Sequence, residues 1–254
     1  MIESFRNIFR VPELRKRLFF TFALLAIYRV GCYIVTPGID PVALREFFQA
    51  AEGTIFGFVN TFTGGGLARA AIFALGIMPY ISASIIFQLL TAVFPYFEKL
   101  QKEGEEGRKK ITQYTRYSTV GLSAVQAYGY AIFLQNFSPD AILFPGIRFI
   151  MMTILVLTTG AVFVMWLGEQ ITERGVGNGM SLLIFFSIIE GFPATIGRTW
   201  ESFTLGEISA FALVALLAII VLVSGGVVAM TMAARKIPVQ IEQKDNKKIE
   251  SKAA

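Results

Sequence analysis

Six long segments of this chain are almost purely apolar, and they constrain the fold more than any other feature. A helix needs about 20 mainly apolar residues to cross a hydrocarbon layer about 30 Å thick. Hydrophobic residues make up 54% of the 254 residues and charged residues 16%, which excludes an ordinary soluble domain. Because the apolar residues are continuous rather than alternating, we expect spanning helices and not a β-barrel. The expected spans are Leu18–Thr36, Leu75–Phe97, Tyr117–Phe137, Ile147–Gly168, Met180–Gly197 and Ile208–Ala234.

The residue types that build metal and catalytic sites are scarce. The chain has no histidine and one cysteine, Cys32, so a zinc or haem site made of these ligands is excluded and we expect no metal and no cofactor. The expected spans contain no pair of acids and no nucleophile beside a base, so we expect a protein that is not an enzyme. The first apolar segment is too long for a cleaved signal peptide, and we treat it as retained.

Lysine and arginine gather in alternate connections between the apolar segments, so the positive-inside rule places both termini in the cytosol with an even number of crossings. We expect a cytosolic amphipathic arm at 1–17, a membrane domain at 18–234, and a basic, disordered cytosolic tail at 235–254. The cytosolic basic residues are Arg6, Arg10, Arg15, Lys16 and Arg17; Lys99, Lys102, Arg108, Lys109, Lys110 and Arg116; and Arg235, Lys236, Lys244, Lys247, Lys248 and Lys252. The other connections carry only Arg45, Arg69, Arg148 and Arg198.

A glycine-rich stretch, TFTGGGLARAAIFALGIMPYISAS, precedes the second span. Its three consecutive glycines cannot support a continuous helix, because glycine loses much backbone entropy on ordering. We expect a short helix at Leu67–Phe73 after this break, and Gly76 and Pro79 mark the start of the main span. Since irregular backbone at membrane depth must be surrounded by protein or water, the stretch predicts a cavity behind the first helix and a movable segment. The preceding Val42–Gly57 is amphipathic and is expected on the outer surface.

Polar side chains follow along the second span at Tyr80, Ser82, Ser84, Gln88 and Thr91. One interpretation is hydrogen bonding between packed helices, and the other is a helix that faces water or a substrate part of the time. The residues alone do not choose between them. Ile77 and Ile81 stack on one face near the helix start, where contacts with lipid or core are the ordinary interpretation.

Two ionisable residues fall inside or near spans, Arg29 and Glu190. A charge in the bilayer is costly unless it is paired with an opposite charge or hydrated, so each residue is a candidate functional residue. Glu190 precedes Gly191 and Pro193, and the alternative is that it lies near the outer end of its helix. The connection Gly168–Gly179 is expected to be a cytosolic turn with Glu169, Glu173 and Arg174 in solvent, and Asn178 is a candidate cap for the next helix.

Four stretches carry a resemblance to a known family, SecY, the protein-translocation channel. The chain resembles that family in order from about Leu14 to Gln240, most specifically in ALGIMPYISAS, KEGEEGRKKITQYTRY, WLGEQITERGVGNGMSLLIF and PGID. The resemblance implies an all-α polytopic membrane protein with about six transmembrane helices and a short re-entrant plug helix at about 62–73. It also implies one five-helix half of an inverted-repeat channel, followed by the first helix of the next half.

The resemblance also assigns roles to residues. A pore ring, whose apolar side chains exclude water by dewetting, would consist of Ile77, Ile81, Met180 and Ile184. The plug would consist of Thr63, Gly64, Gly65, Gly66, Leu67, Arg69, Ala70 and Phe73. The lateral gate would include Ser82, Ile85 and Gln88. The partner-binding loops would present Arg108, Lys109, Lys110, Arg235 and Lys236.

The function implied by the resemblance is movement of unfolded secretory polypeptides across, and of apolar segments into, a bacterial inner (plasma) membrane. The implied partners are SecE and SecG-like subunits, the SecA motor or a ribosome, the translocating polypeptide with its signal sequence, the lipid bilayer and a separate C-terminal half. The alternatives are a small-solute transporter and a structural half-channel fragment that is inactive by itself. The chain ends after the sixth expected span, and a split protein, a fragment or self-pairing about a membrane-normal axis are the explanations left open.

Overall fold

The computed structural model describes residues 11–50, 55–137 and 139–233. Within these residues every long element is a helix, and the only β pairings are two isolated antiparallel bridges, Val35–Ala71 and Ile39–Ile142. The predicted all-α class is confirmed. Residues 1–10 of the expected arm at 1–17, and all of the expected tail at 235–254, lie outside the described residues.

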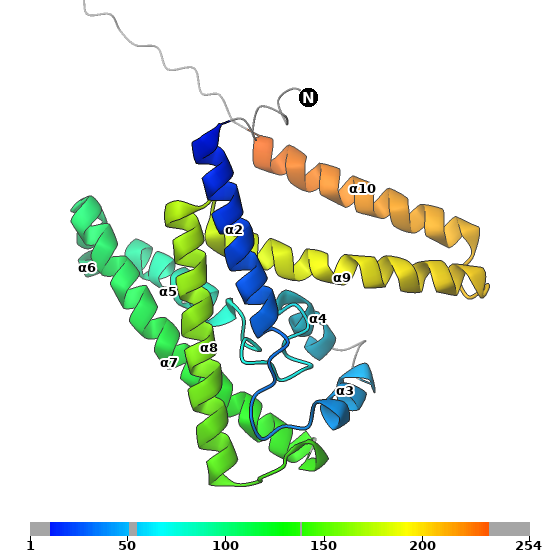
Figure 1. Ribbon diagram of the computed structural model, residues 1–254. Coiled ribbons are helices and arrows are strands. Elements are labelled where there is room, and N and C mark those ends of the chain that lie inside the picture. The colour runs from blue at the N-terminus through cyan, green and yellow to red at the C-terminus, as the bar shows by residue number, and fades with distance from the viewer. Residues whose placement is uncertain (1–10, 51–54, 138, 234–254) are drawn as a thin grey trace, which may run out of the picture. The chain divides into compact units, whose positions relative to one another are not determined.

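The described helices follow one another closely along the chain (Figure 1). They are α2 (Pro12–Gly31), α3 (Pro41–Ala50), α4 (Ile55–Phe62), α5 (Met78–Val93), α6 (Pro95–Lys102), α7 (Glu105–Phe137), α8 (Ile147–Arg174), α9 (Gly179–Thr204) and α10 (Ala210–Met232), with a 3-10 turn, η1 (Pro139–Ala141), between α7 and α8. The chain forms two compact units, Met1–Thr195 and Ile196–Ala254, and α9 continues from the first into the second.

Five of the six expected spans each overlap one helix, namely α2, α7, α8, α9 and α10, and the second span overlaps both α5 and α6. Among the described helices, three are long and apolar enough to cross a membrane by themselves, namely α8, α9 and α10, and the bent pair α5–α6 makes up to four. The count of six spans therefore stays a prediction. None of the residues of α10 is buried, which is typical of a helix that is apolar all round and meets lipid or other chains.

The second expected span, Leu75–Phe97, is not one helix. The chain bends by 97° between α5 and α6. Phe94 adopts an extended conformation at the bend (φ −99°, ψ 122°), because the ring of the following Pro95 disfavours the helical region for the residue before it. The bend separates the apolar α5 from α6, which leads into a helical hairpin that turns at Gly104 (φ 79°).

The first unit is a bundle in which α7 packs mainly against α8 and α5, and α2 packs against α8 (Figure 1). Its apolar core has two parts. One cluster joins α3, α7 and α8 around the fully buried Leu44, Leu134 and Leu157. The other joins α2, α8 and the start of α9 around Leu167 and Leu183. Both clusters include residues from 63–77, so this segment lies inside the bundle.

Residues 63–77, which we call the turn segment, form consecutive turns and not the helix predicted at Leu67–Phe73. The expected short plug helix is therefore wrong in conformation, and the helix before the break is α4. Positive φ angles at Gly64 (60°), Gly65 (73°) and Ala70 (44°) interrupt any helical path. Backbone hydrogen bonds to the chain after α2 take the place of helical ones: Thr36 N–H donates to Ala70 O (2.8 Å) and Ile72 N–H to Ile34 O (2.9 Å).

Candidate functional site

The turn segment is held in the bundle by side chains from several helices. The buried Tyr130 hydroxyl of α7 donates to Leu67 O (2.8 Å). At the start of the segment, Asn60 Oδ1 accepts from Ala68 N–H (2.9 Å) and Thr63 Oγ1 accepts from Leu67 N–H (3.2 Å). These bonds satisfy backbone groups that a helix would otherwise pair internally, which makes an irregular segment tolerable inside a membrane protein.

Close packing at glycines brings the segment against α2 and α8. A Cβ placed on Gly160 of α8 would overlap Ile72 O, and one on Gly31 of α2 would overlap the ring of Phe73. Phe73 stacks on Tyr28 (ring centroids 6.0 Å apart) and on Phe163 (5.7 Å). The segment is therefore fitted between the two helices rather than resting on them.

The predicted plug residues all lie in this segment. Thr63, Gly64, Gly66, Leu67, Ala70 and Phe73 are buried, whereas Gly65 and Arg69 are half-buried. They share one place in the structure. Their role as a plug stays a prediction, because burial alone does not distinguish a plug from a fixed part of the core.

The four predicted pore-ring residues gather in one apolar cluster. Ile77 is 4% exposed and directly precedes α5, at the end of the turn segment. Ile81, Met180 and Ile184 are half-buried and pack against the same cluster. Met180 also lies against Gly168 of α8, where an added Cβ would meet its sulfur. The structure thus brings residues of α5 and α9 together beside the turn segment, and their role as a ring stays a prediction.

Arg29 and Glu190, each singled out as a costly charge, form an ion pair with each other. Both side chains are about one quarter exposed, at 24% and 23%. The alternative that Glu190 lies near the end of its helix is wrong, because α9 continues past Pro193 to Thr204. A charge at this depth is stabilised by an opposite charge, which explains why each residue tolerates its position.

The same arginine also reaches the turn segment. Arg29 Nη1 lies 3.4 Å from Gly64 O, and Arg69 Nη1 lies 3.4 Å from the same oxygen. Both guanidinium groups lie over the ring of Tyr33, at 4.4 Å and 4.3 Å from its centroid. Two positive groups and one carboxylate therefore surround the start of the segment.

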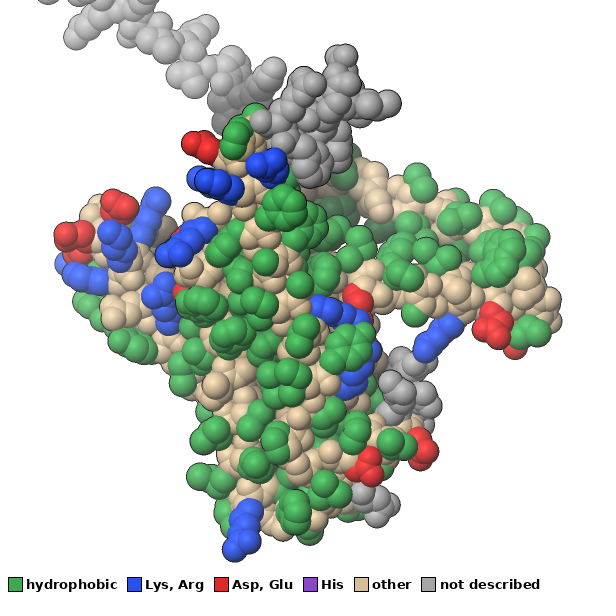
Figure 2. Space-filling model, in the orientation of Figure 1, with side chains coloured by type: hydrophobic (Ala, Val, Ile, Leu, Met, Phe, Trp, Pro, Cys, Tyr) green, Lys and Arg blue, Asp and Glu red, His purple; other side chains and the backbone are tan. Residues whose placement is uncertain are grey.

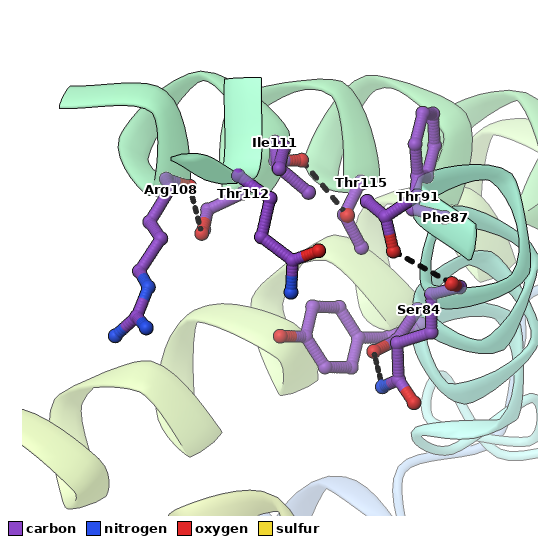
Figure 3. Close-up of a pocket in the computed structure, with 10 residues that line it drawn as sticks. Ser84, Phe87, Thr91, Arg108, Ile111, Thr112 and Thr115 are labelled. Atoms are coloured by element: carbon purple, nitrogen blue, oxygen red, sulfur yellow. Dashed lines mark hydrogen bonds between the residues drawn. The ribbon is translucent and has the colours of Figure 1, made fainter. Parts of the chain in front are cut away.

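A hollow of about 290 Å³ opens between α5 and the α6–α7 hairpin, although the helices also pack on each other (Figure 3). Ser84 and Thr91 enter it from α5, and Arg108 and Thr112 from α7. Its hydroxyl groups donate mostly to carbonyl groups of their own helices, as Thr91 does to Gln88 O (2.7 Å) and Thr112 to Arg108 O (3.0 Å). The hollow shows that the polar side of α5 faces an opening and is not paired wholly with α7.

The predicted lateral-gate residues lie on the outward side of α5. Ile85 is 51% exposed, Gln88 is exposed and donates to Ser84 Oγ (3.2 Å), and Ser82 is half-buried. Ile85 is the most exposed of the three, whereas Gln88 also borders the hollow between α5 and α7. The gate role stays a prediction.

The predicted partner-binding residues Arg108, Lys109 and Lys110 are exposed on the first turns of α7. Arg235 and Lys236 lie outside the described residues. On the face shown in Figure 2, Lys and Arg side chains gather towards the end of the first unit where α2 begins and α6 joins α7, and hydrophobic side chains cover most of α2 and α8.

The connection between α8 and α9 is shorter than expected, because α8 continues to Arg174. Asn178 caps α9 as predicted, with Oδ1 accepting from Ser181 N–H (3.1 Å). Glu173 and Arg174 are exposed as predicted. The prediction for Glu169 is wrong: its carboxylate accepts from Arg116 Nε (2.6 Å), and its side chain is only 14% exposed.

Several residues that build the site carried no signal in the sequence. Tyr28 hydrogen-bonds Ser187 of α9 (2.8 Å), Tyr130 anchors the turn segment, and Thr21 Oγ1 accepts from Val176 N–H (3.1 Å). Hydroxyl groups are common on apolar helix faces. Only the hydrogen-bond partner on a distant element shows that these three hold elements together. In the part of the chain that the structure describes, no group of three or more Cys, Asp or Glu lies together as metal ligands would.

Comparison with known sequences points to one family. The sequence model of the family described as SecY matches residues 71–253. The "Protein translocase subunit SecY" of Pseudomonas aeruginosa is 50% identical over 233 residues, which cover 90% of this chain and 51% of that protein. The proteins of the same name from Aquifex aeolicus and Escherichia coli are 42% and 45% identical, and this chain covers 57% and 52% of them. The chain spans about half the length of these relatives.

Solved structures with the same fold are channels by their descriptions. "Sec61 in the Canine ribosome-channel complex from the endoplasmic reticulum" superposes with a TM-score of 0.62 at 18% identity, over 89% of this chain and 49% of that one. "The structure of a protein conducting channel" gives a TM-score of 0.62 at 17% identity, over 89% of this chain and 51% of that one. At these identities the likeness concerns the fold.

Proposed function

This chain belongs to the SecY family, and from that premise we propose that it is a component of a protein-conducting channel. The channel would pass unfolded secretory polypeptides across a membrane and release apolar segments sideways into lipid. The chain itself would not drive transport, since it would provide the path while a partner would provide the driving force. The relatives named above are translocase subunits, which agrees with a transport role without catalysis.

The observation that carries this proposal is the apolar cluster beside the turn segment. Ile77, Ile81, Met180 and Ile184 bring aliphatic side chains from two helices to one place. An aliphatic constriction excludes water and ions by dewetting, yet it deforms around a passing chain because its contacts are non-directional. Met180 suits such a constriction, since its side chain is flexible as well as apolar.

The turn segment would close the path on the outer side of this cluster. It is inside the bundle but keeps no helical hydrogen-bond ladder of its own. A segment without a helical ladder can move as a unit once its bonds to neighbouring elements and its packing between α2 and α8 give way. Its continuity with Ile77 at the start of α5 supports a coupling between movement of the segment and widening of the cluster.

We place the α6–α7 hairpin in the cytosol, with both termini, on the basis of its exposed basic residues. Arg108, Lys109 and Lys110 would meet the SecA motor or ribosomal RNA, and such contacts depend on salt. The outward side of α5, with Ser82, Ile85 and Gln88, would border the lateral exit for a signal sequence. The exposed apolar helices would contact SecE, a SecG-like subunit, lipid and the C-terminal half of a channel.

Thiol labelling tests the proposal directly. In membrane vesicles from cells that produce this chain with its partners, cysteines replace Ile77, Ile81 or Ile184 in a Cys32→Ala background. We expect a water-soluble maleimide to label each of them when a secretory precursor is arrested during SecA-driven transport, and to label them weakly without it. Leu157→Cys, in the core between α7 and α8, should stay unlabelled in both states.

The outcome that would contradict a polypeptide channel is equal, low labelling of all three positions with and without the precursor. Labelling that instead depends on a small solute, with solute flux into vesicles in the absence of SecA and ATP, would favour a transporter.

A further inference from the structure

Arg29 is the one described residue that contacts both the turn segment and α9 through its charge. It pairs with Glu190, and Nη1 of the same side chain lies 3.4 Å from Gly64 O. The segment contributes Arg69 to the same place, because its Nη1 also points to Gly64 O and its guanidinium lies over Tyr33. The start of the segment is thus fixed between a charge on α2 and a charge on α9.

The backbone fits tightly at this point. Gly64 has a φ of 60°, and a Cβ placed there would lie 3.1 Å from Glu190 Oε2. The carboxylate therefore lies directly against the main chain of the segment. No bulkier residue could take the place of Gly64 without moving either the segment or Glu190.

The balance of charge at this point depends on one residue. Arg29 and Arg69 converge on Gly64 O and Tyr33, and Glu190 is the acid that pairs with Arg29 beside them. Without its negative charge, two cations would face each other in a half-buried position, where screening by water is weak. One of these cations belongs to the segment, so their repulsion would push the segment away from α2.

We propose that Arg29 and Glu190 are positioning residues that hold the start of the turn segment in place, and that separation of this ion pair releases the segment. The inference deepens the proposed function, since the segment would be the closure of the channel. It concerns residues of this chain alone, and it can be measured without any transport.

Cys32 reports the position of the segment in the natural sequence. It is the only cysteine of the chain and is fully buried, at 0% exposed. Its sulfur lies 3.9 Å from the carbonyl oxygen of Thr63, the first residue of the segment. Release of the segment therefore uncovers this thiol, and its rate of alkylation measures how often the segment opens.

The experiment follows alkylation of Cys32 by N-ethylmaleimide in membrane vesicles, by mass spectrometry, for the natural chain and for Glu190→Gln. We expect the variant to react about tenfold faster, which corresponds to about 1.4 kcal/mol less free energy for opening. Glu190→Asp keeps the charge with a shorter reach and should react at an intermediate rate. An unchanged rate in Glu190→Gln would overturn the proposal.

Glu169→Gln is the matched control, because it removes a carboxylate from the Arg116–Glu169 ion pair elsewhere in the bundle. It should leave the rate unchanged, and an equal increase would mean general loosening and would overturn the proposal. The exchange Arg29→Glu with Glu190→Arg separates release from unfolding. An arginine at position 190 can pair with the new acid and reach Gly64 O, so the rate should return towards that of the natural chain.

A double variant as reactive as Glu190→Gln would also count against the ion pair. Failure of the labelling test at positions 77, 81 and 184 would instead contradict the proposed channel. It would have no bearing on the measured rates of Cys32 alkylation. The two ideas therefore fail by different observations.

Discussion

Gly160 lies where the turn segment comes closest to α8, and hydropathy gives no reason to single it out. An added Cβ would overlap Ile72 O, so glycine serves there for close approach and not for a turn. Gly179 is a similar case, because a Cβ there would overlap Gly168 O of the neighbouring helix. By contrast, nothing lies within 4 Å of a Cβ on Gly129 of α7. The residue type is the same, and only the neighbour decides its role.

Gly160→Ala should therefore destabilise the chain, whereas Gly129→Ala should not. Overpacking in a filled interior costs about 1–3 kcal/mol, because the neighbouring backbone must shift. Alanine at an open helical position is favoured over glycine by about 0.5–1 kcal/mol. The midpoint of thermal unfolding in detergent, followed by circular dichroism, measures both variants. A Gly160→Ala protein as stable as Gly129→Ala would contradict the close contact with the turn segment.

For charged residues too, the sequence shows which residues need a partner, and only the structure shows which partner each one has. The sequence singled out Arg29 and Glu190 because each is costly by itself in an apolar segment, and both lie in an ion pair. It did not say that they pair with each other, since they belong to the first and the fifth expected spans. As part of an expected cytosolic turn Glu169 is predicted to lie in solvent, but the neighbouring α7 supplies Arg116 as a partner.

Elements defined by local chemistry were predicted well. Five of the six apolar segments each correspond to one helix and the second to the bent pair α5–α6; the cap at Asn178 is predictable because its side chain bonds a backbone group three residues away. The helix predicted at Leu67–Phe73 is replaced by turns, because beside bonds within the segment this stretch also bonds Ile34, Thr36 and Tyr130, which are distant in sequence. An element whose partners lie outside its own sequence window cannot be read from propensity.

The cap on α9 gives a prediction for this element. Asn178→Ala should reduce stability by about 1 kcal/mol, because the first turn of α9 loses an acceptor for Ser181 N–H. Amide hydrogen exchange in the first turn should become faster, while exchange in α7 stays the same. Asn178→Ser, which also caps helices, is the matched control and should keep the protection. Equal protection in the alanine variant would show that packing against α8 holds this turn without the cap.

The orientation in the membrane is a property of the whole chain, because it depends on the sum of charges in alternate connections. Basic residues at the start of α2 and in the α6–α7 hairpin lie towards the same end of the first unit (Figure 2). The connection between α7 and α8, by contrast, carries no lysine or arginine before Arg148. This asymmetry supports a single orientation over a mixture.

Reporter fusions measure this orientation. Alkaline phosphatase inserted after Gly146, between α7 and α8, should be active because that connection is expected outside the cytosol. The same enzyme inserted after Gly177, between α8 and α9, should be inactive, and a fluorescent protein there should fluoresce. The reverse pattern would place the hairpin outside and remove the basis for contact with a cytosolic motor.

Features that depend on neighbours along the chain could be predicted from the residues alone: the membrane environment, the all-α class, the approximate positions of the helices, the cap at Asn178 and the break at the glycines. The tertiary structure alone decided how residues far apart meet. It placed the turn segment between α2 and α8, joined Arg29 to Glu190 and gathered Ile77 with Ile184. The physical reason is that hydropathy and propensity act over a few residues, whereas ion pairs, close contacts at glycines and buried hydrogen bonds form between elements once the helices have packed.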